Sequence, residues 1–277
     1  MRGNRGENCK RSWETPITWR ATPAPHKMNW LEEIIARKRD DIAKMQAEEF
    51  QARAERRDDF RDFHAAIRRG SGHVRIIAEA KSASPSAGMI MANYDPAQVA
   101  KRYEANGADA ISVLTEQNYF RGDPEHLTAV REAVTLPILR KDFIIDERQI
   151  LESVAIGGDA ILLIVAALTP KQLYTLHDCA TANKLSALVE VHTLEEIGIA
   201  VDAGAQIIGI NNRNLATLEV DLANAEKLLP GVPNGITIVS ESGIRTAADL
   251  KRMAALAVDA LLVGEGLMRG EISIKDL

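Results

Sequence analysis

Eight short runs of aliphatic and β-branched residues recur between residues 74 and 263, and they constrain the fold more than any other feature. Runs of this length predict buried strands, and segments with helical periodicity separate them. The predicted strands are 74–80, 110–115, 137–141, 160–165, 186–191, 206–210, 236–240 and 260–263. Helices are expected to begin near Pro96, Pro124, Glu147, Pro170, Leu194, Leu222 and Thr246.

The alternation of strands with helices determines how the strands can pair. A strand that returns to its sheet through a helix runs parallel to the strand before it, with a right-handed crossover. Parallel strands are covered on both faces, which explains the unbroken apolar run 161–165. Eight such units in about 200 residues predict an α/β fold, a closed (β/α)8 TIM barrel, rather than an open sheet.

The residues before the first strand predict an addition to the barrel. Apolar stripes at helical spacing run from Leu31 to Arg69, so we expect extra N-terminal helices over 28–70 and the barrel over 71–277, together one domain. Residues 1–27 contain three prolines and no apolar periodicity. We expect them to form a disordered N-terminal tail that adds nothing to the core.

Composition excludes several classes of protein. The chain has 39 acidic and 34 basic residues, a net charge of −5, which argues against a nucleic-acid binder with a basic face. Its apolar runs are shorter than the ~18 residues of a membrane span. Cys9 and Cys179 are too far apart for a zinc cluster, and of the six histidines only His192 falls near the predicted mouth. We therefore expect no metal site and a reducing cytoplasm.

A weak repeat supports the count of eight units. Similar tetrapeptides and tripeptides precede the second, fourth, sixth and eighth predicted strands, at 107–110, 158–160, 204–206 and 258–260. Three of them carry glycine, which suits the left-handed end of a helix. We expect them to shape the helix-to-strand turns at the floor of the barrel, without a chemical role.

Charged side chains stand at the carboxyl ends of the odd-numbered strands. In a TIM barrel, alternate strands contribute to one layer, and active sites lie at the carboxyl-terminal face. The residues expected to converge there are Glu79, Lys81, Lys141, Glu190 and Glu241, with Asn211 from the sixth strand. Charges in a low-dielectric mouth are costly unless paired, so this many indicate a catalytic site rather than one structural salt bridge.

The last two strands run into glycine-containing loops that suit a phosphate group. Backbone N–H groups can approach an oxyanion closely there, and this is the usual phosphate site of the fold. The expected contacts are Gly243, Gly264 and Glu265, with Lys81 or Arg213 adding positive charge. Small residues over 84–88, after the first strand, are expected to form a lid.

Several of these segments together resemble the indole-3-glycerol-phosphate synthase family. They are 79–86 (EAKSASPS), 111–115 (ISVLT) with Tyr119 and Phe120 after it, 141–146 (KDFIID), 209–215 (GINNRNL) and 240–244 (SESGI). The resemblance covers roughly residues 30 to 270, in family order and with barrel spacing. Members often carry serine where Glu265 or Gly266 stands, so backbone donors are implied for that phosphate contact.

The resemblance implies a lyase of tryptophan biosynthesis that uses no cofactor. Its small phosphorylated substrate would be 1-(2-carboxyphenylamino)-1-deoxyribulose 5-phosphate. Ring closure, decarboxylation and dehydration would yield indole-3-glycerol phosphate, CO2 and water. The extra N-terminal helices would partly cover this substrate.

The resemblance also implies roles for single residues. Lys141 would be the general acid at the ribulose carbonyl, and Glu190 a general base or an aid to loss of the hydroxyl. Lys81 would pair with the substrate carboxylate or phosphate, or supply the acid of the second step, with Glu79 orienting the lysines. Further implied contacts are Asn211 and Glu241 to hydroxyls, Phe120, Phe143 and Leu163 to the aromatic ring, and Ser84, Arg213 and Ser242 to the substrate.

Two other interpretations remain open. The neighbouring isomerase of the pathway is also a barrel, but it calls for cysteine at the first strand end and aspartate at the sixth, where this chain has Glu79 with Lys81, and Asn211. A non-catalytic barrel that binds a phosphorylated ligand would leave the lysine–glutamate cluster without a purpose. We expect a cytoplasmic monomer or weak homo-oligomer with no membrane or nucleic-acid partner.

Overall fold

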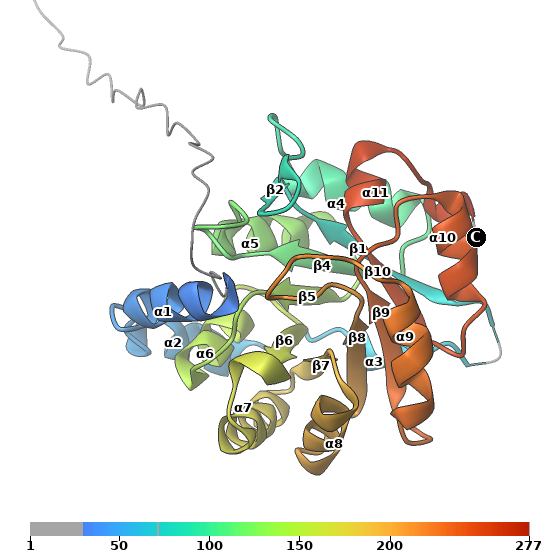
Figure 1. The fold of residues 1–277 in the computed structure, drawn as a ribbon. Coiled ribbons are helices and arrows are strands. Elements are labelled where there is room, and N and C mark those ends of the chain that lie inside the picture. The colour runs from blue at the N-terminus through green and yellow to red at the C-terminus, as the bar shows by residue number, and fades with distance from the viewer. Residues whose placement is uncertain (1–29, 71, 277) are drawn as a thin grey trace, which may run out of the picture.

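Eight parallel strands close into one barrel in the computed structural model, which describes residues 30–70 and 72–276 (Figure 1). The strands are β1 (Arg75–Ala80), β4 (Ala110–Leu114), β5 (Ile138–Lys141), β6 (Ala160–Ile164), β7 (Ser186–Val191), β8 (Ile207–Asn211), β9 (Thr237–Glu241) and β10 (Ala260–Val263). Their order around the barrel is β1-β10-β9-β8-β7-β6-β5-β4. The predicted (β/α)8 fold is confirmed, and each strand lies within a residue or so of its predicted bounds.

Helices pack around the outside of the barrel. They are α4 (Pro96–Ala105), α5 (Pro124–Ala133), α6 (Glu147–Ala155), α7 (Pro170–Ala182), α8 (Leu194–Asp202), α9 (Ala223–Leu228), α10 (Ala247–Ala254) and α11 (Glu265–Arg269), with 3-10 turns η1 (Val165–Ala167), η2 (Leu229–Gly231) and η3 (Ile274–Asp276). The side chains of the N-cap residues Asp95, Asp123, Thr169 and Thr193 accept backbone N–H groups at the helix starts. Within the described residues, no helix is long and apolar enough to cross a membrane.

The loop after β1 contains a small hairpin. Strands β2 (Ala83–Ser84) and β3 (Gly88–Met89) pair antiparallel, and Gly88 has a φ of +63° at the return. The hydroxyl of Ser84 accepts the N–H of Ala87 and holds the turn together.

Side chains alternate between the barrel interior and the helix layer, because successive residues of a strand face opposite ways. The interior floor is made of aliphatic side chains from all eight strands: Ile77, Ala110, Leu139, Ala160, Leu188, Ile207, Val239 and Ala260. The opposite set packs under the helices, and Leu163 belongs to it, in the same core cluster as Leu173 and Leu176 of α7. This alternation decides which side chains can reach a ligand in the mouth.

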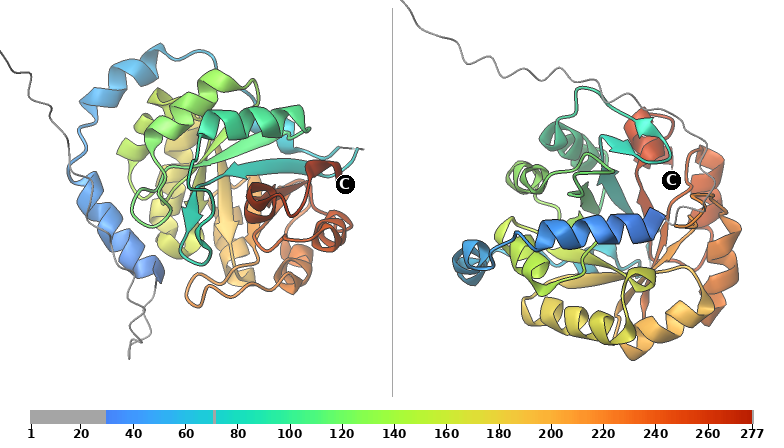
Figure 2. Two further views of the ribbon diagram at one scale, coloured as in Figure 1. Left: turned by 90° about the horizontal axis from the view of Figure 1, so that it is seen from above. Right: turned by 60° about the vertical axis from the view of Figure 1, so that its left-hand side comes forward.

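The N-terminal extension wraps the barrel from end to end. It forms three helices, α1 (Trp30–Ile42), α2 (Glu48–Arg56) and α3 (Phe63–Ile67), where the sequence predicted helix over the whole segment. Helix α1 lies across the barrel opening (Figure 2, right), and α2 packs against α6. Phe63 and Ile67 of α3 join the interior floor cluster and close the other end. The expected tail 1–27 lies outside the described residues.

The helix is broken between α2 and α3 because side chains there bind the barrel floor. Arg57 donates to the carboxylate of Asp159 at 2.6 Å, and the backbone N–H of Arg61 donates to the same carboxylate at 3.0 Å. An extended chain reaches these acceptors, and a continued helix would not. Tertiary contacts here outweigh helix propensity.

The weak sequence repeat has a clear structural purpose. The aspartates Asp109, Asp159 and Asp259 each accept a backbone N–H near the start of β1, β5 or β9, from Ile76, Ile138 and Ile238, over 2.8, 2.9 and 2.9 Å. Each carboxylate therefore joins neighbouring strands at the floor. The repeat copy at 204–206 has the exposed Gln206 where the other three copies have aspartate.

Replacing Asp159 tests this floor. Its buried carboxylate also pairs with Arg131 at 2.8 Å, so Asp159→Ala leaves Arg57 and Arg131, two largely buried arginines, with only the exposed carboxylate of Asp59 as an ion-pair partner. Breaking a buried ion pair in this way should lower the free energy of unfolding by about 3–5 kcal/mol, measured by urea denaturation. The exposed Asp58→Ala is the control and should change it by less than ~0.5 kcal/mol. Equal stability of both variants would refute the role assigned to Asp159.

Candidate active site

A cavity of about 320 Å³ lies at the carboxyl ends of the strands, between the barrel mouth and helix α1. All but one of the residues predicted for the site line it. They are Glu79, Lys81, Ser84, Phe120, Lys141, Phe143, Glu190, Asn211, Arg213, Glu241, Ser242, Gly243, Gly264 and Glu265. The barrel therefore brings together residues up to 186 positions apart in the sequence, from Glu79 to Glu265.

Leu163 is the exception, and its prediction as a pocket residue does not fit the structure. Its side chain is fully buried under the outer helices, whereas its neighbours Leu162 and Ile164 line the cavity. The prediction chose the wrong face of β6. The apolar run 160–165 has no alternation that could have indicated the inward face.

Lys141 lies at the centre of the charged cluster. Its Nζ is 3.1 Å from Oε2 of Glu241 and 3.2 Å from Oε2 of Glu190. Burial alone would lower the pKa of Lys141, but Glu241, Glu190 and Glu79 raise it well above its usual range. The amine therefore stays protonated at neutral pH and can donate a proton.

The pKa values of the two carboxylates beside Lys141, Glu190 and Glu241, are shifted in opposite directions. Burial raises the pKa of both, but Lys141, His192 and Asn211 lower that of Glu190 below its usual range. Glu241 shares Lys141 with Glu190, and burial together with that neighbouring negative charge raises its pKa. A pair whose pKa values are pushed apart can divide acid and base roles.

Glu79 and Lys81 form a second pair in the mouth. Lys81 directly follows β1, and its Nζ is 2.5 Å from Oε2 of Glu79, two residues before it in the chain. Burial would raise the pKa of Glu79, but Lys81 and Lys141 lower it. Glu79 thus holds one lysine directly and stabilises the charge of the other.

The glycine-containing loops after β9 and β10 line the cavity beside Lys81. Ser242 and Gly243 have φ values of +67° and +92°, and a Cβ on Gly243 would collide with Val220 and Leu222. Gly264 is the N-cap of α11 and lies against the Glu79–Lys81 pair. The Glu265 carboxylate turns to Arg269, 3.1 Å away, so only its backbone is free to face an anion.

An apolar wall lies opposite the charged cluster. The rings of Phe120 and Phe143 are 6.3 Å apart between centroids. Helix α1 contributes Trp30, Leu31 and Ile34, which the sequence placed on a covering helix but not in the pocket. Other lining residues that the sequence did not indicate are Leu114, Leu162, Ile164, Leu215, Leu218, Val220, Ile244, Arg245 and Leu262.

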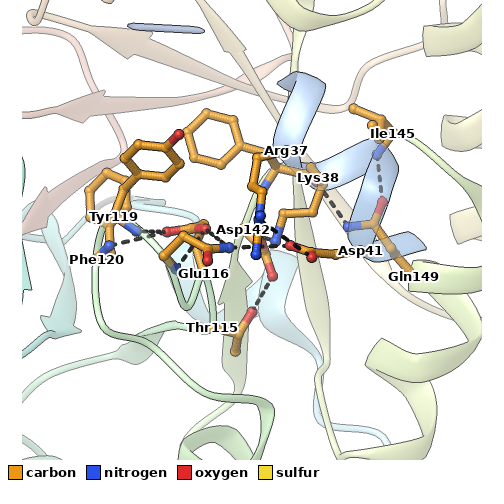
Figure 3. A network of polar contacts seen from close by, with 12 residues as sticks. Arg37, Lys38, Asp41, Thr115, Glu116, Tyr119, Phe120, Asp142, Ile145 and Gln149 are labelled. Carbon is orange, nitrogen blue, oxygen red and sulfur yellow. Dashed lines mark hydrogen bonds and ion pairs between the residues drawn. The ribbon is translucent and has the colours of Figure 1, made fainter. Parts of the chain in front are cut away.

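A buried polar network fastens α1 to the strand that carries Lys141 (Figure 3). Lys38 Nζ is 2.7 Å from Asp142, and Asp142 also accepts the hydroxyl of Thr115 at 2.7 Å and pairs with Arg140 at 3.2 Å. Burial would raise the pKa of Asp142, but Lys38 and Arg140 lower it. The residue next to Lys141 is thus an anchor for the covering helix.

His192 is also part of this region, although sequence reasoning assigned it no role. Its Nε2 is 3.4 Å from Oε1 of Glu190, yet it does not line the cavity. Among the described residues, no group of three or more histidine, cysteine, aspartate or glutamate side chains is placed to hold a metal ion.

Comparison with known proteins gives one consistent family. The family model described as "Indole-3-glycerol phosphate synthase" matches residues 31–277. Curated relatives with that name include one from Chloroherpeton thalassium, 46% identical over 88% of this chain and 96% of its own. Another is from Geobacillus sp., 48% identical over 86% and 92%.

Solved structures with lower identity share the fold alone. An N-acetylmannosamine-6-phosphate 2-epimerase from Clostridium perfringens is 16% identical with a TM-score of 0.57, covering 77% of this chain and 95% of its own. A mandelate oxidase mutant is 18% identical with a TM-score of 0.53, covering 71% and 66%.

The Lys38–Asp142 pair predicts how α1 is held. Lys38→Met removes a buried charged hydrogen bond worth about 1.5–3 kcal/mol, so α1 should open more often. Hydrogen exchange followed by mass spectrometry should show faster exchange over 30–42, with the barrel strands unchanged. Arg37→Met, at an exposed position of the same helix, is the control. Equal exchange in the two variants would mean that other contacts hold α1.

Proposed function

The chain belongs to the indole-3-glycerol phosphate synthase family, and from this premise we propose how its cavity carries out the family's reaction. It is a carboxy-lyase of tryptophan biosynthesis. The reaction converts 1-(2-carboxyphenylamino)-1-deoxyribulose 5-phosphate to indole-3-glycerol phosphate, CO2 and water. The observation that carries the assignment of roles is the protonated Lys141 held between Glu190 and Glu241.

Lys141 is the general acid of ring closure. As the aryl carbon attacks the ribulose carbonyl, negative charge builds on the carbonyl oxygen, and the Lys141 ammonium donates its proton there. The new carbon–carbon bond makes the aryl carbon tetrahedral. Loss of CO2 from that carbon then returns the bonding electrons to the ring.

Glu190 is the general base of the dehydration. Its lowered pKa keeps it ionised, so it can take the proton whose loss forms the indole double bond. The hydroxyl formed in the first step takes a proton from a lysine and leaves as water. Lys141 and Lys81 are the two candidates for this proton donor. Glu79 keeps Lys81 oriented, and Asn211 and Glu241 bind substrate hydroxyls.

The two walls of the cavity orient the substrate. The anthranilate ring lies against Phe120, Phe143 and the apolar face of α1. The phosphate lies at Gly243, Gly264 and the backbone of Glu265, where first-turn N–H groups have no intrahelical partner. Lys81 and Arg213 supply positive charge there, and Ser84 and Ser242 add hydroxyl contacts.

We also propose that the enzyme works in the cytoplasm as a monomer or weak homo-oligomer, acting on a small phosphorylated molecule. The family's place in amino-acid biosynthesis supports this setting. Size measurement by light scattering would test the oligomeric state.

Lys141→Met tests the acid role, since it keeps the apolar stem and removes the proton and charge. Loss of a general acid costs about 10²–10⁴-fold in rate, so kcat should collapse while KM changes little. The assay is fluorescence of the indole product, with circular dichroism to verify folding. Near wild-type activity would overturn the role.

The competing mechanism is a Schiff base between Lys141 and the keto group of the substrate. Borohydride treatment in the presence of substrate should leave no mass adduct on Lys141, because we assign it proton transfer and not covalent attachment. A stable adduct would contradict the acid role.

Gly264→Ala tests the phosphate site. Its φ is unstrained, but the added Cβ would displace the Glu79–Lys81 pair. We expect KM to rise about tenfold, as for loss of one charged hydrogen bond, and inhibition by inorganic phosphate to weaken equally. Gly198→Ala on α8, with open space where the new Cβ would lie, is the control. An unchanged KM with unchanged phosphate inhibition would place the phosphate elsewhere.

A further inference from the structure

His192 lies beside Glu190, directly after the carboxyl end of β7. The two oxygens of Glu190 are divided between different cations, since Oε2 faces Lys141 at 3.2 Å and Oε1 faces Nε2 of His192 at 3.4 Å. His192 does not line the cavity, so it reaches the substrate only through Glu190.

Glu196 fixes the position of His192 from the first turn of α8. Its Oε2 accepts the backbone N–H of His192 at 2.6 Å and lies 3.3 Å from the ring Nδ1. In a capping box, the glutamate at this position bonds the N–H of the N-cap residue. Thr193 is the N-cap and binds the N–H of Glu196, but the Glu196 carboxylate reaches one residue further back, to His192.

We propose that His192, held by Glu196, is a positioning residue that fixes the orientation and the negative charge of Glu190. The inference rests on the base role proposed for Glu190. Lys141 alone cannot do this, because Glu241 shares its ammonium. A second cation on the far oxygen leaves Glu190 one orientation, with Oε2 toward the cavity.

The charges around both groups agree with this role. Burial would lower the pKa of His192, but Glu190 and Glu196 raise it to about 10, so the ring is an imidazolium at neutral pH. Glu190 is faced by Lys141 of β5 and Asn211 of β8 as well as by His192, and Glu241 of β9 brings a negative charge near. Loss of the imidazolium therefore raises the pKa of Glu190.

His192→Gln keeps a hydrogen-bond donor and removes the charge. The pKa of Glu190 should rise by about 1 unit, as expected for an opposite charge at this distance. A carboxylate with a raised pKa becomes protonated at a higher pH as the pH falls. The acid limb of the kcat/KM profile should therefore move to higher pH by about 1 unit. At the pH optimum, kcat should fall about 10- to 100-fold, since small misplacements of a catalytic group cost this much, while KM stays within about twofold.

Three further variants make the test decisive. Glu196→Gln should move the acid limb in the same direction by a smaller amount, and it carries the test if His192→Gln does not fold. His177→Gln, a half-buried histidine on α7, should leave the profile at its wild-type position.

Glu190→Gln distinguishes a failure of the role proposed for His192 from a failure of the base role proposed for Glu190. If Glu190→Gln is inactive while His192→Gln and Glu196→Gln have wild-type profiles, the inference on His192 is wrong. If Glu190→Gln retains activity, the base role proposed for Glu190 fails first.

Discussion

Closure of eight parallel strands into one barrel puts every second side chain into a narrow interior, where a charge is stable only beside an opposite charge. The floor of the barrel is lined with aliphatic side chains, and in the mouth the lysines are paired with glutamates. Lys141 lies between Glu190 and Glu241, and Lys81 lies on Glu79. The pairing of Lys141 keeps its amine protonated and separates the two carboxylates beside it into one that ionises easily and one that does not.

The N-terminal extension both closes the floor of the barrel and covers the active-site mouth. Helix α3 seals the floor with Phe63 and Ile67, and α1 covers the mouth. The buried Lys38–Asp142 pair joins α1 to the residue that follows Lys141. A single polar network therefore supports both the cover and the strand end that presents the acid, so the two are expected to be ordered together.

Much of the barrel could be predicted because its signals are local. Aliphatic runs mark strands, and caps such as Asp95 and Thr169 mark helix starts. The charged residues at the strand ends could be found because a regular strand and a closed barrel determine where they point. Leu163 was misplaced because an unbroken apolar strand carries no alternation to show its inward face. The broken helix at 57–62 was missed because Asp159, about a hundred residues away, supplies the bonds that break it.

The sequence by itself determined the strand–helix repeat, the family and most of the charged and polar residues around the cavity, because each depends on residue type and local spacing. Only the tertiary structure decided which carboxylate faces which cation. Glu241 joins Glu190 on Lys141, and His192 faces the other oxygen of Glu190, because strand register and the first turn of α8 set these distances. Electrostatic energies in a buried site change steeply over such distances, so the division of roles among chemically similar groups comes from the fold.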